Sequence, residues 1–589
     1  MTTWNLSTIL PDASPTGIES ALLSLETAHT AFAETWKART DWKTEPTAAL
    51  EALVAYEQLQ SAYGMGGPVD YYLSMKQALD SADTETKAAL TKLAARLSKT
   101  EKELFFFEET LSKLPQETLA AFLANPTLAP YHHFLERLAV HGKYLLSESE
   151  EYILSRKSVP ARQHWTELVD QLLYAETVEL GGETLTLPAL MSKIQEPATS
   201  EEAAVLVSGI MQKHAPVAAA EMTALLLDHQ INDELRKRDR PDTARHLSDD
   251  IASEAVDTLV DTVAAHYPLA HRFYALKAKL LGLEKLTYAS RILPIQSEES
   301  PSYTWDEALT FTTKVLSKLD PQYGEILQDF VNKGQVDVFP KKGKRGGAFC
   351  AYHLPESPVL MLLNFNGKED DITTLAHETG HGINDVLIAK KQNALNLGTP
   401  LATAEVASTF MEDFVLEELA ATATPKRQLD LLMSRLDDDI ASCFRQIACY
   451  QFEQDLHATL RAEGNLSAEK IGELFAKHMQ AYLGESVVMD ASYNSWWVYW
   501  SHIRSHFYVY SYASGLLIAK ALQSKVRKDP KAIEQVNAFL AVGRSQSPTQ
   551  AFADLGIDIT DAAFWEEGIA QIEQTLNTAE ALATELKLI

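Results

Sequence analysis

The stretch TTLAHETGHGIND, residues 373–385, places two histidines four positions apart. On an α-helix, residues i and i+4 lie on one face one turn apart, so the imidazoles of His377 and His381 can bind one ion together. Glu378 lies about 100° further round such a helix, from where its carboxylate can reach a water on that ion. The pattern therefore indicates a metal site with a proton acceptor beside it. A surface helix that happens to carry polar residues is the alternative interpretation.

A third ligand for this metal is expected from a separate element, because a catalytic zinc site has three protein ligands and one open position. Glu405, in the next expected helix over 401–419, is the candidate. The turn at 393–400 lets the chain double back, and the small apolar neighbours of Glu405 favour a ligand over a surface charge. Glu412 lies seven positions further on, so it shares the same helix face and can accept a hydrogen bond from a ligating imidazole.

The composition is that of a globular protein: of 589 residues, 46% are hydrophobic and 23% are charged. There are 81 acidic and 52 basic residues, which gives a formal net charge of -29. This field repels phosphate backbones and anionic lipid, so we expect neither nucleic acid nor a membrane surface as a partner. No run reaches the roughly 18 apolar residues of a membrane-spanning helix.

The chain has only three cysteines, which is too few for a disulfide framework in a chain of this length. Its first residues lack the basic start and the apolar run of a signal peptide. These features together favour a reducing, cytoplasmic location.

Helical periodicity dominates the sequence and predicts a mainly α fold. Apolar residues recur at three- and four-residue spacing over 17–37, 45–63, 70–110, 115–125, 199–240, 247–282, 402–421, 426–463, 468–483, 502–527 and 531–541. The exception is a small sheet at about 284–368, with short strands expected at 335–340, 346–354 and 359–367. We expect a helical N-terminal region over 1–190, followed by a second region over 191–589.

The small sheet precedes the histidine-bearing helix directly. An exposed edge strand can pair with an extended peptide through main-chain hydrogen bonds. Either GGAFCAYHL (346–354) or VLMLLNFNG (359–367) is the candidate edge. A purely structural sheet is the alternative for each.

A second unusual stretch, YNSWWVYWSHIRSHFYVYSYASG at 493–515, is crowded with aromatic residues and contains two histidines. Tyr508 and Tyr512 are spaced i, i+4, and buried tyrosine hydroxyls need partners. A tyrosine or histidine near a catalytic metal can donate a hydrogen bond to a developing oxyanion. Spacing alone does not choose between His502 and His506 for this role.

Several segments of the sequence resemble those of a known family. LAHETGHGIND, followed by AEVASTFMED, resembles the zinc site of the oligoendopeptidase F group within the wider thimet oligopeptidase family. KKGKRGGAF, LMLLNFNG, FYVYSYASG, NPTLAPYHHFLERL and LSESEEYIL are similar as well. Together these segments span about residues 100 to 520 in the expected order.

The resemblance implies a two-lobed, mainly helical, zincin-type metallopeptidase with a small β-sheet beside the active-site helix and a deep central channel. It implies one Zn²⁺ per chain, held by His377, His381 and Glu405, with Glu378 as the base. In these terms the region 1–190 is similar to the N-terminal part of oligoendopeptidase F. The region 191–589 is then the zinc metallopeptidase catalytic region.

The same resemblance implies that His502 helps to stabilise the transition state, which leaves His506 outside this role. It points to Tyr508 and Tyr512 as substrate-binding residues, with Tyr510 as a further possibility. At Asn384 many relatives have a histidine instead. Because that position is outside the ligand set, we expect it to affect local packing.

The expected activity is hydrolysis of internal bonds in short, unstructured oligopeptides. One alternative is a carboxypeptidase or dipeptidase on the same zinc scaffold, with Arg345 or Arg504 holding the terminal carboxylate of the substrate. A non-catalytic peptide-binding protein is the more distant alternative.

Overall fold

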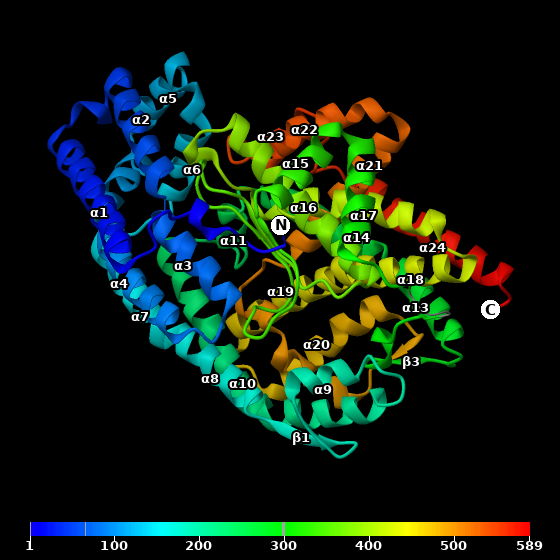
Figure 1. Ribbon diagram of the computed structural model, residues 1–589. Coiled ribbons are helices and arrows are strands. Elements are labelled where there is room, and N and C mark those ends of the chain that lie inside the picture. Colours follow the sequence, from blue (N-terminus) through cyan, green and yellow to red (C-terminus); the bar gives the residue numbers. More distant parts are fainter. Residues whose placement is uncertain (1, 65, 297–300) are drawn as a thin grey trace. The chain divides into compact units, whose positions relative to one another are not determined.

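Helices form most of the chain in the computed structural model, which describes residues 2–64, 66–296 and 301–589 (Figure 1). The predicted mainly α fold is confirmed. The chain divides into two compact units, each built from three separated segments. The first unit contains Met1–Lys143, Ser300–Glu418 and Leu522–Ile557, and the second contains Tyr144–Glu299, Leu419–Ala521 and Asp558–Ile589.

The first unit combines an N-terminal group of helices with the helices and the sheet that surround the histidine-bearing segment. Its helices are α1 (Pro15–Ala38), α2 (Pro46–Tyr63), α3 (Gly67–Leu79), α4 (Thr84–Ser112), α5 (Gln116–Leu123), α6 (His132–Gly142), α14 (Trp305–Leu319), α15 (Pro321–Asn332), α16 (Glu369–Lys391), α22 (Ile533–Leu540) and α23 (Pro548–Ala553). Two further helices, α17 (Val406–Thr422) and α21 (Tyr510–Lys528), each continue from one unit into the other.

Aromatic side chains form the core of the N-terminal helices. The ring of Trp42 stacks on Phe107 with 4.9 Å between the centroids. Its indole Nε1 donates a hydrogen bond to the backbone oxygen of Trp36 at 2.9 Å. Burying one such apolar side chain contributes about 1.5–3 kcal/mol to folding, so this core supports a group of helices whose outer faces are polar.

The helix predicted over 70–110 is interrupted. Helix α3 ends at Leu79 and α4 begins at Thr84. The carboxylate of Asp83 accepts hydrogen bonds from the backbone nitrogens of Glu85 and Thr86, which starts a new helix in the middle of an otherwise continuous apolar period.

The three predicted strands are present as β4 (Val336–Asp337), β5 (Phe349–Ala351) and β6 (Leu360–Leu362). Strand β6 is central: it pairs with β4 in parallel and with β5 antiparallel, with Met361 opposite both Val336 and Cys350. The prediction that VLMLLNFNG (359–367) provides a free edge strand is therefore wrong, because β6 within it pairs with a strand on each side. Strand β5 is an edge of this sheet. Residues 297–300, within the predicted 284–368 stretch, lie outside the described residues.

The start of the chain anchors this sheet. The indole Nε1 of Trp4 donates to the backbone oxygens of Gln335, at 3.1 Å, and Met361, at 2.8 Å. The Trp4 ring packs in a buried cluster with side chains of α3 and β6. A long-range contact of this kind holds a sheet whose strands are too short to be stable alone.

The second unit is also helical and has two small sheets. Its helices are α7 (Glu148–Ser158), α8 (His164–Tyr174), α9 (Leu187–Lys193), α10 (Ser200–Arg236), α11 (Thr243–Ser248), α12 (Ser253–Ala265), α13 (Tyr267–Leu280), α18 (Pro425–Ile440), α19 (Gln446–Glu463), α20 (Ala468–Leu483) and α24 (Ala562–Glu585). Strands β1 (Thr177–Leu180) and β2 (Glu183–Thr186) form a hairpin, and β3 (Leu286–Thr287) pairs in parallel with β7 (Val487–Val488).

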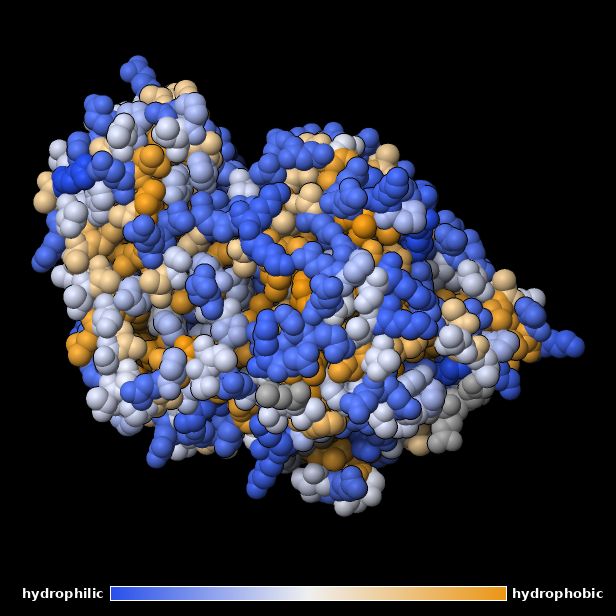
Figure 2. Space-filling model, turned by 45° about the horizontal axis from the view of Figure 1, so that its top comes forward, coloured by the Kyte–Doolittle hydropathy of each residue, from blue (hydrophilic) through white to orange (hydrophobic). Residues whose placement is uncertain are grey.

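Hydrophilic side chains cover most of the face shown in Figure 2, and apolar ones lie between them in smaller groups. Within the described part of the chain, no helix has the length and apolar character that a membrane crossing requires.

Candidate metal centre and active site

Helix α16 carries the two histidines of the opening stretch. Asp370 and Asp371 are of the residue type that N-caps favour, but the N-cap is Lys368. The carboxylate Oδ2 of Asp371 reaches back and accepts hydrogen bonds from the backbone nitrogens of Lys368 and Asn366, both at 2.8 Å. A carboxylate at the third helical position can satisfy the free N–H groups of the helix end, so the helix starts earlier than an aspartate cap would allow.

The structure brings His377, His381 and Glu405 together. The Nε2 atoms of both histidines lie 3.4 Å from Oε2 of Glu405. One ligand atom from each of the three residues lies within 4.8 Å of the others. Two imidazole nitrogens and a carboxylate oxygen at this spacing form the donor set that Zn²⁺ takes in catalytic sites.

Glu405 is not in a helix, contrary to the expected helix over 401–419. It follows a short 3-10 turn at Leu401–Thr403 and directly precedes α17. Its backbone oxygen accepts from the nitrogen of Thr409 at 3.1 Å, and its Oε2 accepts from the hydroxyl of Ser408 at 2.9 Å. Glu405 thus opens α17, with its carboxylate directed by Ser408 and by the two histidines.

Gly380, between Glu378 and His381, allows the two helices to approach. A Cβ atom at this position would lie 2.6 Å from the backbone oxygen of Ala407 and 2.6 Å from Cα of Ser408. Such distances are not tolerated, so any larger residue would push the start of α17 away from α16. The glycine before the second histidine is therefore a packing requirement of the site.

We expect Gly380→Ala to destabilise the protein by about 1–3 kcal/mol and to weaken metal binding, because Glu405 would move away from the histidines. Chemical denaturation and a metal-binding titration measure the two effects. Gly209→Ala is a matched control in the interior of α10, where an added Cβ meets nothing within 4 Å. It should be neutral or stabilising by up to about 1 kcal/mol. Equal effects of the two substitutions would contradict the packing argument.

Glu412 supports His377 from the other side of its ring. Oε2 of Glu412 accepts a hydrogen bond from Nδ1 of His377 at 2.8 Å. This bond places a proton on Nδ1, so Nε2 is the ring atom that can bind a metal ion.

The charges of the site are strongly coupled. Burial lowers the pKa of His377, but hydrogen bonds with Glu405 and Glu412 outweigh burial and raise it to about 10. Burial raises the pKa of Glu405, but the two histidines outweigh burial and hold this pKa well below its usual range. The low pKa of Glu405 keeps negative charge beside the two imidazoles, and such charge favours a bound divalent cation.

Glu378 has the environment of a proton acceptor. The residue is only 6% exposed, and its Oε2 has no hydrogen-bond partner among the described residues. Burial raises the pKa of its carboxyl group above the usual value. Glu378 lines a pocket of about 620 Å³ together with His377, His381 and Glu405. An unpartnered buried oxygen beside the three ligand atoms fits a bound metal and a water, so the residues present fit a zinc ion.

The wall of this pocket contains a residue that the sequence reasoning missed. Asp385 lies one turn beyond His381 on α16 and lines the pocket with Tyr352, His353 and residues 348–350. Burial raises the pKa of Asp385 to about 7. The spacing of four from His381 is the signal that places Asp385 on the same helix face.

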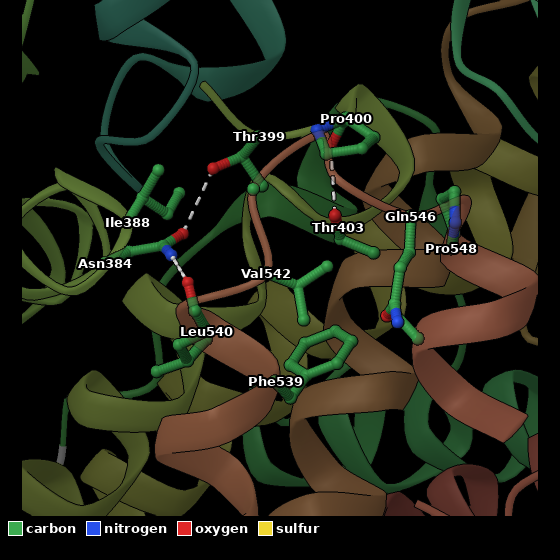
Figure 3. Close-up of a pocket in the computed structure, with 12 residues that line it drawn as sticks. Asn384, Ile388, Thr399, Pro400, Thr403, Phe539, Leu540, Val542, Gln546 and Pro548 are labelled. Atoms are coloured by element: carbon green, nitrogen blue, oxygen red, sulfur yellow. Dashed lines mark hydrogen bonds between the residues drawn. The ribbon is translucent and has the colours of Figure 1, made fainter. Parts of the chain in front are cut away.

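Asn384 fastens α16 to its surroundings (Figure 3). Its side-chain nitrogen donates to the backbone oxygen of Leu540 at 2.6 Å, and its side-chain oxygen accepts from the hydroxyl of Thr399 at 3.2 Å. Because Thr399 belongs to the segment that leads to Glu405, these bonds help to set the path of that segment. This agrees with the packing role expected of Asn384.

His502, Tyr508 and Tyr512 form a group in the second unit. Nδ1 of His502 is hydrogen-bonded to the hydroxyl of Tyr508, and the rings of Tyr508 and Tyr512 lie 5.8 Å apart. Tyr510 is fully buried, with its hydroxyl donating to Asp249 at 2.7 Å, and His506 is buried elsewhere. The helix expected over 502–527 begins only at Tyr510, so Tyr508 precedes it.

Arg504, one of the two arginines considered for a carboxypeptidase, is already engaged. It is buried, and its guanidinium donates to Glu221 at 2.6 and 2.7 Å. Arg345 is exposed, with its guanidinium 5.1 Å from the ring centre of Phe349. Of the two arginines, only Arg345 therefore keeps a free guanidinium face for a substrate carboxylate.

Comparison with known proteins places the chain in a family. The model of peptidase family M3 matches residues 213–571, more than half of the chain, and the model of oligopeptidase F matches residues 111–174. Group B oligopeptidase PepB of Streptococcus agalactiae is 26% identical over 526 residues, which cover 87% of this chain and 86% of the relative. Oligopeptidase PepF of Bacillus subtilis is 30% identical over 339 residues, covering 57% and 50% of the two chains.

The fold agrees with that of a solved structure. The crystal structure of oligoendopeptidase-F from Enterococcus faecium superposes with a TM-score of 0.71 and covers 96% of this chain and 99% of the other, at 22% identity. Together, the extent of the family match and the fold show that this chain belongs to peptidase family M3 and is a metallo-endopeptidase.

Proposed function

We propose that the chain is a zinc-dependent oligoendopeptidase that hydrolyses internal bonds of short, unstructured peptides. In this proposal His377, His381 and Glu405 hold one zinc ion, and Glu412 keeps His377 in the correct orientation. A zinc ion held there supplies Lewis acidity, which polarises a carbonyl group and makes a water molecule more acidic. The names of the relatives, oligopeptidase and oligoendopeptidase, favour short peptides as substrates.

Glu378 moves the proton in this proposal. Glu378 lines the same pocket as the ligand residues, its Oε2 has no hydrogen-bond partner among the described residues, and burial raises the pKa of its carboxyl group towards the range in which a general base works best. Glu378 takes a proton from the attacking water and passes it to the nitrogen of the leaving amine. The roles of His502, Tyr508 and Tyr512 in substrate binding and in steadying the oxyanion stay predictions, and the resemblance supports them.

We propose that β5 binds the substrate backbone. It is an edge strand, and its residues Phe349 and Cys350 line the same pocket as the ligand residues. An extended peptide that adds to such an edge is held through main-chain hydrogen bonds, which depend little on its side chains. This mode suits an enzyme that accepts peptides of many sequences.

The observation that carries the proposal is the convergence of three ligand atoms within 4.8 Å, in a pocket that Glu378, with its unpartnered Oε2, also lines. The test is a set of peptides blocked at both ends by acetyl and amide groups, with the products identified by mass spectrometry. We expect cleavage at internal bonds, which the chelator 1,10-phenanthroline abolishes and added zinc restores. If only peptides with a free terminal carboxylate were cut, the carboxypeptidase alternative with Arg345 would replace this proposal.

We expect Glu412→Gln to weaken zinc affinity by about 10–100-fold, because the amide is a poorer acceptor for Nδ1–H of His377 than the carboxylate. Competition with a chromophoric chelator measures the affinity. Glu418→Gln is a control on the same helix, where the side chain pairs with Lys318 instead. Parent-like affinity of the Glu412 variant would show that this hydrogen bond has no role in metal binding.

The division of the chain into two regions and its location in the cytoplasm are also part of this proposal. We propose residues 1–190 as an N-terminal region and 191–589 as the catalytic region, with the matches to oligopeptidase F and peptidase family M3 in support. All three cysteines are free, and Cys443 and Cys449 are buried. Free thiols of this kind favour the reducing cytoplasm.

A further inference from the structure

A second group of ligating side chains lies in the second unit, apart from the ligand set on α16. Helix α19 presents Glu453 and His457 one turn apart, and His506 comes from the loop that precedes α21. One ligand atom from each residue lies within 4.8 Å of the others. The arrangement repeats the pattern of the first site, in which a helix supplies two ligands at i and i+4 and a separate segment supplies the third.

The polar atoms of this Glu453–His457–His506 cluster are buried and lack partners. Glu453 and His457 are 1% exposed and His506 is 7% exposed. Oε2 of Glu453, Nε2 of His457 and Nδ1 of His506 have no hydrogen-bond partner among the described residues. Leaving such a buried group unsatisfied costs about 1–3 kcal/mol of folding free energy, and more if it is charged. Three such atoms close together therefore indicate that a bound ion or water satisfies them.

The carboxylate of Glu453 has little other support. Its Oε1 accepts a hydrogen bond from the backbone nitrogen of Phe507 at 2.9 Å and lies 3.7 Å from Nδ1 of His506. Within the described residues it forms no ion pair with a lysine or arginine. Burial raises the pKa of this carboxyl group well above its usual value, and the charge of Arg245 only partly offsets the effect of burial. A divalent ion beside Oε2 would stabilise the ionised carboxylate.

The loop that supplies His506 has an unusual backbone. The φ angles of His506 and Phe507 are 47° and 58°, in the left-handed region that costs about 1–2 kcal/mol for each residue other than glycine. Arg245 donates hydrogen bonds to the backbone oxygens of His506, at 3.3 Å, and Ser505, at 3.2 Å. Hydrogen bonds from Arg245 and to Glu453 stabilise this backbone conformation, in which the ring of His506 lies beside Glu453 and His457 of α19.

We propose that the Glu453–His457–His506 cluster binds one divalent first-row transition ion, with Zn²⁺ as the preferred species, in a structural role. Two imidazole nitrogens and one carboxylate oxygen suit such an ion. The unpartnered atoms are closed to solvent, so the ion enters during folding and takes no part in turnover. A buried water is the other occupant of suitable size, and the metal content of the protein distinguishes the two.

The bound ion would hold the loop between His502 and Tyr508 at His506, one of its two residues with a positive φ angle. The loop joins His502 to Tyr508, and these two side chains are hydrogen-bonded to each other. An ion between α19 and His506 therefore sets the geometry of that pair. This inference is independent of the function proposed for the first site.

The two sites differ in access, and the experiment uses that difference. The ligand side chains of the first site, His377, His381 and Glu405, are 29%, 25% and 37% exposed. The full chain is produced in zinc-supplemented medium, and its metal content is measured by mass spectrometry before and after prolonged native chelation. We expect two zinc ions per chain before chelation and one after it, with the second released only when guanidinium unfolds the chain. A chelated parent protein that retains no metal would overturn the proposal.

Two variants identify the retained ion. His506→Asn removes the imidazole and keeps a residue type that adopts positive φ easily, while Glu453→Gln preserves the size of the side chain. Each should retain no zinc after native chelation. His478→Asn is the control, since His478 is also buried but already paired with Asp455 at 2.8 Å. It should retain one ion.

The variants also separate this proposal from that for the first site. Before chelation, the His506 and Glu453 variants should still contain the zinc ion of the first site, which native chelation then removes. If the proposal for the first site were wrong, this removable zinc would be missing, whereas the retained zinc would be unaffected. If the His506 and Glu453 variants are folded by circular dichroism and retain as much zinc as the parent, the cluster is not the site. Because the chelated parent gives the ion count without any substitution, a variant that fails to fold does not decide the question.

Discussion

Replacing Glu378 with glutamine is expected to lower kcat by about 10²–10⁴-fold, the range that general acid–base catalysis contributes. The amide has the same size as the carboxylate and fits the same buried position, but it cannot accept a proton from water. The histidines and Glu405 are unchanged, so the variant should bind zinc as the parent does. The loss should appear in kcat, with KM little changed, because the proton transfer occurs in the transition state and not in substrate binding.

Steady-state kinetics on a quenched peptide, together with metal analysis of the same sample, measures both quantities. Asp370→Asn is a suitable control, because it makes the same chemical change at an exposed position in the first turn of the same helix. It should retain parent activity. If the Glu378 variant were as active as the parent, the assignment of the base would be wrong.

Replacing Glu405 with glutamine is expected to weaken zinc affinity by more than about 100-fold, beyond the range seen when an outer partner of a ligand is lost. The substitution removes the only negative charge among the three ligands and leaves a neutral amide oxygen of similar position. The affinity of the site for zinc therefore falls, although the hydroxyl of Ser408 can still donate a hydrogen bond to the side chain. Activity in metal-free buffer should fall by about 10³-fold or more, since Lewis acidity contributes several kcal/mol to the reaction.

Measuring activity at increasing zinc concentration tests the prediction for Glu405→Gln and distinguishes it from that for Glu378→Gln. Excess zinc should restore part of the activity of the Glu405 variant, whereas it should not restore the Glu378 variant. Glu417→Gln is the control on α17, where the carboxylate pairs with Arg527 at 2.5 Å. A Glu405 variant that keeps one tightly bound zinc ion and parent activity would remove Glu405 from the ligand set.

Several features of the fold follow from local patterns in the sequence. The apolar periods predict most helices, and the strands at 335–340, 346–354 and 359–367 contain β4, β5 and β6. The hairpin β1–β2 was not predicted, although a Gly-Gly pair between two short runs is a recognised signal for it. Gly181 and Gly182 have φ angles of 62° and 86°, which only glycine adopts freely.

Other features could not be read from local patterns. Helix α21 begins at Tyr510 and not at 502, although the apolar spacing continues through the whole stretch. The positive φ angles of His506 and Phe507 break the helix, and contacts from Arg245 and Glu453 hold them. Both partners are distant in sequence, so the break is a tertiary effect.

The sequence by itself determined that His377, Glu378 and His381 share a helix, since a spacing of four residues sets their positions at any place in the fold. It also suggested Glu405, but only the tertiary structure brought that carboxylate to the histidines, through the close approach that Gly380 permits. The two compact units, each built from three separated segments, were likewise decided by tertiary packing. The physical reason is the same in each case: helical geometry is local, whereas the distance between two helices depends on the side chains that both of them bury.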